Sequence, residues 1–509
     1  MPDTSFTDSN CDGIDGNLSL AIFVAQFGSD TNNGSRTQPV RSLTRAAAIA
    51  AANPSGQSQI LMENGVYESQ ATTYVNDNVT IAGGHTRSGD AWTRGSGRAT
   101  LRANRPPGVR TPGFSYNPSF WPNLNIISDV NFEVSSAGTS GESAIALDCT
   151  NCTNVTMTNV TVSAGPGAIG VSGATQTTEL GGISGVAGAS PTTGDGGTPL
   201  ASTLDRCNGV GGSQGEYGEV EPFYGQGGWG RRGLQGRVSN GFFGHDARNA
   251  QNIFHANTFF INTTGGTRVP DNNIPVEPRV GGNGAARNVP QAAAAGGGNT
   301  GGYSFFSGWA REAGQSGARG FPGIGGGGGA GGGLCCTENG YAGAGGATPG
   351  CYGDGATGGG PGGSSIGLVL VSTTAIIFNN VSIAAGPGGA GGRGGPGGFA
   401  GSGAAGGTVP VSGIRTQQVG HNGGASSGGQ GGNGGGGGAG GCSFALLRPA
   451  ASTITGSPSL SASGAGTAGG GGTGGSGGAR GNPALIGQST NGAGGLQGAI
   501  GESLSDRLY

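Results

Sequence analysis

The chain has no lysine, because all 24 of its basic residues are arginine. Schiff-base chemistry, a P-loop lysine and a lysine general base are therefore excluded. Charged residues make up only 10% of the sequence, and the formal net charge is -3. This balance provides no electrostatic basis for binding nucleic acid, and we expect no nucleic-acid partner.

Long apolar runs and grouped catalytic side chains are also missing. No apolar stretch approaches 18 residues, so we expect no membrane-spanning segment. The four histidines are scattered and form no H-x-x-x-H pair. A G-x-S-x-G match at 211–215 has no weight, because glycine is so common that chance supplies the pattern. We therefore predict a non-enzymatic protein and nominate no catalytic residue.

Glycine is abundant, with 121 in 509 residues, and it recurs with a period of three. Residues 387–398 read PGGAGGRGGPGG, and residues 430–441 read QGGNGGGGGAGG. Three residues per turn is the period of polyproline II, which has no internal hydrogen bonds. The phase predicts packed polyglycine II helices in which each triplet points one row of side chains outward. The alternative is a set of flexible linkers, which have no reason to hold phase.

The N-terminal third reads as short strands around one helix. An alanine-rich helix is predicted over 42–52, with Ser42 placed to cap it. The predicted strands are brief and evenly spaced, at 21–24, 59–67, 72–75, 79–82 and 100–102. This spacing suits a solenoid better than a sandwich, whose strands are usually longer.

An internal repeat of 25 residues supports the solenoid. Residues 143–167 align without gaps to 364–388, and a weaker copy with one inserted residue covers 442–466. The alignment matches Ile145 to Ile366 and Asn159 to Asn380. Single coils of this length cannot bury their apolar faces alone, so we predict stacked coils with glycine-rich excursions between them. We expect the asparagines of the recurring Asn-Val-Thr triplets to stack between coils.

Several motifs carry a resemblance to a known fold family. The residues are Gly28-Ser29-Asp30, Asn33, Pro39 and Gly65-Val66-Tyr67. Over residues 20–175 the chain resembles bacterial secreted right-handed parallel β-helix proteins of the pectate-lyase-like kind. The glycine triplets resemble the polyglycine II sandwiches of phage tail-fibre adhesins. Together these imply an all-β fold, a right-handed parallel β-helix with packed polyglycine II helices as an additional layer, and no single activity.

The first twenty residues contain a candidate calcium loop. Oxygen-bearing side chains occupy loop positions 1, 3 and 5, and glycine occupies position 6, the spacing that hard cations require. Position 12 of the loop is Ser19 in place of the bidentate glutamate of an EF-hand, so the loop is not a complete EF-hand. The piece is similar to the D-x-N-C-D-G metal-binding motif that precedes β-helices in secreted bacterial proteins. The candidate ligands of Ca²⁺ are Asp8, Asn10, Asp12, the Ile14 carbonyl and Asp15. The alternative is an Asx-rich turn.

Aromatic residues and arginines gather between residues 211 and 311. Flat rings can stack on sugars or proteins at small entropy cost, so this segment is a candidate binding tip. The candidate ligand-binding residues are Tyr224, Trp229, Arg231, Phe243, His245 and Trp309. The alternative is a local core between the two layers.

Eight cysteines, an even number, favour disulfides and an oxidising compartment. Cys149 and Cys152 are a candidate local pair, because a two-residue gap permits bridging geometry at a strand corner. The adjacent Cys335 and Cys336 are expected to reach different partners, with Cys207 and Cys351 as candidates. The connectivity stays open.

The sequence divides into four predicted parts. They are a metal-binding-like segment at 1–20, a parallel β-helix at 21–175, a glycine- and aromatic-rich insertion at 176–310, and a polyglycine II layer at 311–509 with β-helix coils at 364–385 and 442–462.

Three functions compete for this organisation. The leading hypothesis is a structural protein, extracellular or on the outer cell surface, that associates with itself. The second is an adhesin or carbohydrate-binding surface protein that binds surface glycans through the aromatic insertion. The third is a polysaccharide lyase or hydrolase, which rests on the fold resemblance alone. Its candidate acid pair is Asp129 and Asp148, expected on adjacent coils and with no lysine or arginine nearby.

Overall fold

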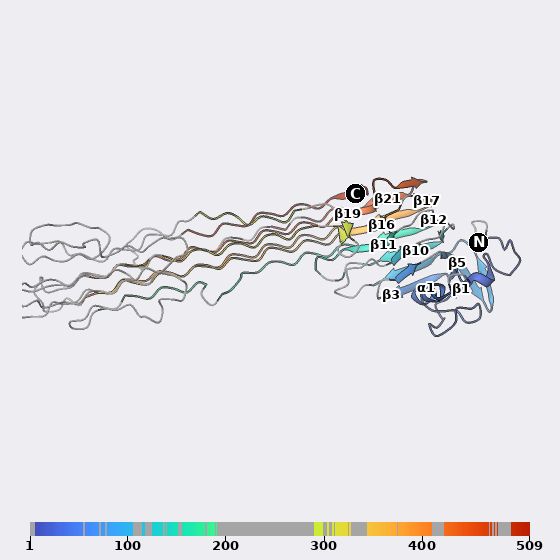
Figure 1. Cartoon of the computed structure of the whole chain (residues 1–509), viewed down its shortest axis with the longest axis horizontal. Coiled ribbons are helices and arrows are strands. Elements are labelled where there is room, and N and C mark those ends of the chain that lie inside the picture. The colour runs from blue at the N-terminus through green and yellow to red at the C-terminus, as the bar shows by residue number, and fades with distance from the viewer. Residues whose placement is uncertain are drawn as a thin grey trace, which may run out of the picture.

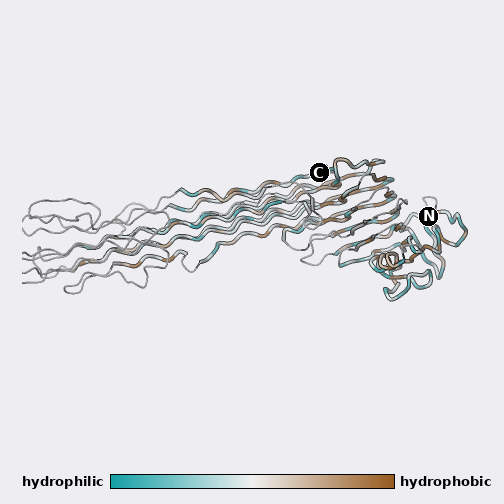
Figure 2. The backbone as a smooth tube through the Cα atoms, in the orientation of Figure 1, coloured by the Kyte–Doolittle hydropathy of each residue, from teal (hydrophilic) through white to brown (hydrophobic). Residues whose placement is uncertain are grey.

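The computed structural model describes residues 6–190, 290–326, 344–409, 422–476 and 490–509, with short gaps inside these ranges. Its strands stack in parallel in three sheets, which confirms the predicted all-β parallel β-helix. Glycine-rich segments leave one side of this body and extend far from it (Figure 1). Hydrophobic residues are concentrated on the strands of the body, whereas the extended segments are mostly pale (Figure 2).

Each sheet takes one strand from each successive coil. Sheet A consists of β1 (Ala21–Val24), β2 (Gln59–Glu63), β5 (Thr80–Ser88), β9 (Asn125–Ser128), β12 (Val155–Thr158), β17 (Ala375–Asn379) and β20 (Thr453–Thr455), with β6 (Ala91–Arg94) antiparallel to β5. Sheet B consists of β3 (Gly65–Ser69), β7 (Ala99–Ala103), β10 (Val130–Val134), β13 (Thr161–Ala164), β18 (Ser382–Ala385) and β21 (Ser459–Ala462). Sheet C consists of β4 (Thr73–Asn76), β8 (Phe114–Asn117), β11 (Ala144–Thr150), β16 (Ser365–Val371), β19 (Ser443–Arg448) and β22 (Ser503–Leu508).

The repeat alignment predicts the register of the coils correctly. Ile145 pairs with Ile366 in sheet C, and Val162 pairs with Ile383 in sheet B. At the turn between sheets A and B, the Asn380 amide donates to the Asn159 side-chain oxygen at 2.7 Å. Asn159 in turn donates to Asp129 at 3.1 Å, and all three residues have a positive φ. For Asn159 the predicted stacking therefore occurs, at the left-handed position that Asn and Asp tolerate best. The other two predicted asparagines, Asn78 and Asn154, lie outside the described residues.

The interior of the coils is filled by stacked aliphatic and aromatic side chains. Leu101, Phe132, Val162 and Ile383 follow one another on sheet B, and each is at most 2% exposed. The first coil is covered by α1 (Leu43–Ala52), which lies against β1, β2 and β4. Ser42 caps this helix as predicted, because its hydroxyl accepts the Arg45 N–H at 3.1 Å.

Glycine-rich runs leave the body after sheet B and return to it before sheet C. We call the set of runs the arm. Its runs are residues 165–190, 290–298, 311–326, 344–363, 386–409, 422–442, 463–476 and 490–502. The predicted β-helix segment 21–175 thus includes the beginning of the first run, and the strands at the predicted coils 364–385 and 442–462 lie between runs of the arm. Between the second and third runs the chain turns at the body through β14 (Tyr303–Ser304) and β15 (Gly308–Trp309).

The run 422–442 lies at the centre of the arm. Its consecutive N–H groups bond to different neighbours in turn, so that Gly435, Gly436 and Gly437 donate to three separate runs at 2.8–2.9 Å. The pattern repeats every third residue, and its carbonyl groups accept from further runs in the same way. The six neighbours are 290–298, 311–326, 344–363, 386–409, 463–476 and 490–502. Lateral bonding with a period of three is the pattern that polyglycine II requires, since such a helix has no internal bonds.

One expectation about the triplets is wrong for the central run. Its non-glycine row does not point to solvent: Gln430 and Asn433 are at most 1% exposed. With neighbours on all sides, no outward face exists, so these short polar side chains bond to adjacent runs instead. The Asn433 amide donates to the Ala292 carbonyl at 2.7 Å and its oxygen accepts the Ala493 N–H at 2.8 Å. On the peripheral run 386–409 the expected outward row exists, with Arg393 and Phe399 exposed.

Glycine inside the arm is required by close backbone approach. A Cβ at Gly394 would lie 1.9 Å from the Gly435 carbonyl oxygen of the central run. We predict that Gly394→Ala destabilises the protein by about 1–3 kcal/mol, because the two runs must separate. Arg393→Ala is the matched control and should stay within about 0.5 kcal/mol, since Arg393 is exposed. Denaturant unfolding measures both; a stabilised Gly394→Ala would show that the runs are not packed.

Candidate functional site

The N-terminal loop is organised by its own carboxylates. The two Asp8 oxygens accept the N–H groups of Asp12 and Gly13 at 3.2 and 2.8 Å. The Asp12 oxygens accept the N–H groups of Ile14 and Leu18 at 3.2 and 2.7 Å. These are the contacts of an Asx-rich turn, which was the alternative reading of this segment.

The acidity of Asp12 follows from these contacts. Partial burial by itself raises its pKa, but the hydrogen bonds from Leu18, the Asn10 amide and Ile14, together with the positive charge of Arg36, outweigh it. The net result is a lowered pKa, so Asp12 is a carboxylate over a wide pH range. A charged oxygen cluster of this kind is compatible with a hard cation.

Asp15 has a different role from the predicted one. Its carboxylate lies 2.7 Å from Arg94 Nη1, and both side chains are at most 2% exposed. Ile14 inserts its side chain into a small core with Phe23 and Trp92 and is 1% exposed. The part of the chain that the structure describes contains no group of three or more His, Cys, Asp or Glu side chains placed to hold a metal. Asp15 is therefore an ion-pair partner of Arg94 and no longer a candidate calcium ligand. Calcium binding by Asp8, Asn10 and Asp12 stays a prediction, which calorimetric titration would test.

Arg94 joins the N-terminal loop to the body. Besides Asp15, its guanidinium bonds to Asp129 at 2.6 Å and to the Ser128 hydroxyl at 2.7 Å. Arg94 Nε donates to the Gly83 carbonyl at 3.2 Å. We call Asp15, Arg94 and Asp129 the clasp. The one buried guanidinium is the counter-charge of two buried carboxylates, and the pairing fixes residues far apart in sequence.

His85 lies beside the clasp and is fully buried. Its ring centroid is 6.2 Å from that of Trp92, and neither ring nitrogen has a hydrogen-bond partner. Burial, and then the positive charge of Arg94, lower the pKa of His85 to about 3. The imidazole is therefore neutral at physiological pH. No sequence motif identified the clasp or His85, since they converge only when the N-terminal loop, the β5–β6 hairpin and the turn after β9 fold together.

The acid pair of the enzyme hypothesis is inaccessible. Asp129 is 3% exposed and paired with Arg94, while Asp148 is fully buried on β11. A polysaccharide cannot reach either carboxylate in this conformation. The expectation that Asp129 has no arginine nearby is wrong, because Arg94 approaches it from another coil.

Trp309 is a core residue and not an exposed binding residue. It is 2% exposed and packs edge-on against Phe444 with a centroid separation of 5.1 Å. Its cluster on the outer face of sheet C includes Ile145 and Ile366, and the Arg507 guanidinium covers the ring at 5.3 Å. The local-core alternative is therefore correct for Trp309. The other candidates, Tyr224, Trp229, Arg231, Phe243 and His245, lie outside the described residues.

Two of the predicted cysteines are disulfide-bonded, Cys149 and Cys351. Their partners are not among the described residues, since the other described cysteines, Cys11 and Cys442, are not disulfide-bonded. The candidates Cys152, Cys207, Cys335 and Cys336 lie outside the described part of the chain, so the predicted pairings stay predictions.

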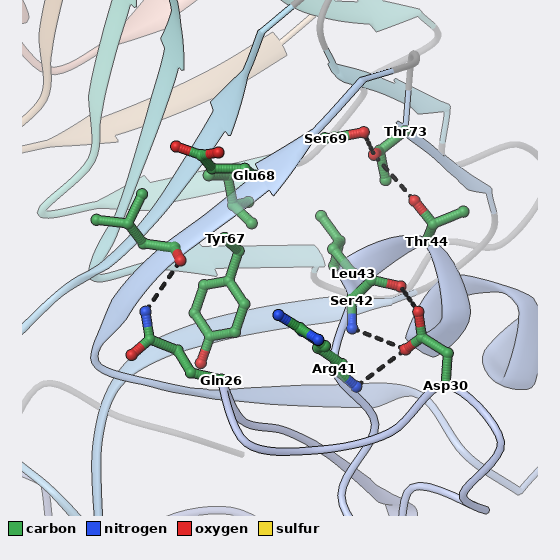
Figure 3. Close-up of a pocket in the computed structure, with 12 residues that line it drawn as sticks. Gln26, Asp30, Arg41, Ser42, Leu43, Thr44, Tyr67, Glu68, Ser69 and Thr73 are labelled. Atoms are coloured by element: carbon green, nitrogen blue, oxygen red, sulfur yellow. Dashed lines mark hydrogen bonds between the residues drawn. The ribbon is translucent and has the colours of Figure 1, made fainter.

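A polar pocket of about 610 Å³ lies between the start of α1 and β3 (Figure 3). Asp30 lines the pocket and fixes the start of α1, because it accepts the N–H groups of Arg41 and Ser42 at 2.9 Å and the Ser42 hydroxyl at 2.8 Å. Tyr67 lines the wall and donates to the Glu63 carbonyl at 2.8 Å. The exposed charges of Arg41 and Glu68 face this space without an ion pair. The mixed charge favours no single ligand class.

The pocket explains the motif on which the fold resemblance rests. Asp30 of Gly28-Ser29-Asp30 ties the loop to the first turn of α1, and a Cβ at Gly28 would lie 2.4 Å from the Val40 carbonyl oxygen. The Pro39 carbonyl accepts the Ser29 N–H at 3.2 Å. These residues shape the end of the β-helix, so their presence indicates fold and not catalysis.

Comparison with known proteins agrees with this geometry. Residues 26–190 match a family described as a protein of unknown function (DUF1565), which is associated with parallel β-helix proteins. Over that third of its length the chain is similar to this family. No curated protein matches the chain, and no solved structure does. No helix among the described residues is both long and apolar enough to cross a membrane.

The clasp should contribute strongly to stability. We predict that Arg94→Met destabilises the protein by about 3–5 kcal/mol, because it leaves Asp15 and Asp129 buried without a counter-charge. The control is Arg102→Met, which removes an ion pair to Glu133 of similar length, 2.9 Å, at a site where both side chains are more than a third exposed. That change should cost at most about 1 kcal/mol. Equal losses in denaturant unfolding would show that the clasp is not a buried pair.

His85 should make the protein acid-sensitive. The native state keeps His85 neutral down to a pKa of about 3, whereas the unfolded chain protonates it near 6.5. Between these values the unfolded state binds more protons, so stability falls as pH decreases. We predict that His85→Met reduces the slope of unfolding free energy against pH by about 1.4 kcal/mol per pH unit in this window. Parallel profiles for the variant and the wild type would contradict the assignment.

Proposed function

We propose that this chain is a non-enzymatic structural protein, secreted or held at the outer cell surface, whose β-helix carries the glycine-rich arm as a stiff spacer. The observation that carries the proposal is the run 422–442, enclosed by six other runs to which it is hydrogen-bonded. A flexible linker has no such fixed lateral partners. Stiffness therefore comes from backbone bonding, and side-chain chemistry is not needed for it.

The buried chemistry of the body supports the same proposal. The acids and the histidine that an enzyme would use, Asp129, Asp148 and His85, are at most 3% exposed. Asp129 is paired with Arg94, which also binds Asp15 and so fixes the coils to the N-terminal loop. The disulfide-bonded Cys149 and Cys351 support an oxidising location outside the cytosol.

Small-angle scattering of the purified chain tests the spacer role. A straight run of 21 residues such as 422–442 spans about 65 Å. We expect an elongated particle whose long dimension exceeds that of the body by at least about this length, and protection of the 422–442 amides from hydrogen exchange. Antibody labelling of intact, non-permeabilised producing cells should detect the chain. A compact particle with rapidly exchanging arm amides would contradict the proposal.

A further inference from the structure

The last coil and the last pair of runs form one open face of the molecule. We call β20, β21 and β22, together with the runs 463–476 and 490–502, the last unit. Among the described residues, each of these strands is hydrogen-bonded to a strand on one side only. The opposite end of the stack is covered by α1 (Figure 1). Solenoid ends without a polar covering element are sites where further units add.

The apolar stacks are incomplete on this face. Ile454 and Leu460 are only partly buried, whereas Ile376 and Ile383, one coil below them, are completely buried. More apolar side chains are exposed along the returning run and β22. They are Leu496, Ile500, Leu504 and Leu508, with exposed fractions of 55%, 67%, 39% and 47%. Such a row, continuous with an open sheet edge, indicates an interaction surface.

The arm is open on the same side. In run 490–502 the N–H groups of Gly494, Gln497 and Ile500, one in every triplet, have no backbone partner among the described residues. In run 386–409 the outward-facing position of the triplet is occupied by proline twice, at Pro387 and Pro396. Proline has no N–H group, so no unpaired donor exists at these two positions. The described residues of the last two runs contain no proline. Proline thus removes two of the unpaired N–H groups of run 386–409, at Pro387 and Pro396, and removes none among the described residues of the last unit.

The charges on this face are balanced within it. Arg448 pairs with Asp506 at 2.8 Å, and Arg507 approaches Glu502 at 3.5 Å. The described residues of the two runs carry no other charge than Glu502. Two identical faces can therefore meet without like-charge repulsion, which is the requirement of a two-fold symmetric interface.

We propose that the last unit binds the last unit of a second copy of this chain. A partner must have open β-strand edges and triplet runs with the same relative position as the strands and runs of the last unit. A second copy of this chain has that arrangement. Because α1 covers the other end, the contact closes into a dimer and does not continue into a fibre. The inference rests on the proposed structural function, because it requires the arm to be stiff.

Sedimentation equilibrium of the full chain tests the dimer. We expect the wild type to dimerise and Ile500→Arg to weaken the dimer on the order of a hundredfold, because two like charges then meet at the two-fold contact. The matched control is Ile169→Arg on the run 165–190, away from the last unit. Ile169 is 65% exposed, close to the 67% of Ile500, so both variants should fold equally well.

The outcomes separate the two proposals. A wild type that is monomeric at every concentration, or an Ile169→Arg variant that dissociates as much as Ile500→Arg, overturns the assigned interface. An Ile500→Arg variant that stays dimeric also overturns it. If scattering still shows an extended arm in that case, the spacer function stands; a compact particle would contradict the spacer function itself.

Discussion

The structure depends on lateral hydrogen bonds between backbones that carry no side chain at the point of contact. Each such bond contributes only about 0.5–1.5 kcal/mol, and each glycine that is ordered loses more backbone entropy than alanine by about 0.5–1 kcal/mol. A single run therefore gains nothing by becoming ordered. The central run 422–442 becomes favourable because its N–H and C=O groups are used on several sides at once.

The β-helix solves the problem of bringing the runs together. Successive coils place their strands about 4.8 Å apart, so the runs that leave β13, β18 and β21 begin as neighbours. Their return ends are held in the same way by β16, β19 and β22. Both ends of each pair are thus held by the coils, which reduces the closure entropy that a free glycine chain would lose.

Sequence patterns predicted the features that are local or periodic. The 25-residue repeat gave the correct pairing of Ile145 with Ile366, and the triplet phase indicated lateral packing. The buried clasp was not predictable, because Asp15, Arg94 and Asp129 meet only through tertiary packing. The sequence left the burial of Trp309 open, since an aromatic residue in a glycine-rich segment looks the same whether it faces solvent or the outside of sheet C.

A lattice of bare backbones has consequences for recognition. Its backbone N–H and C=O groups have the same spacing in any triplet run, so they discriminate poorly between ligands. Selectivity must then come from positions where side chains interrupt the lattice, such as the exposed Ile169, Phe399 and Ile500, or from the register that the coils impose. Register selects a partner more strictly than single side chains do, because only a chain with matching coils and runs can bond to the strand edge of the β-helix and to the edge of the arm at the same time. The architecture therefore favours recognition of its own kind over recognition of small ligands.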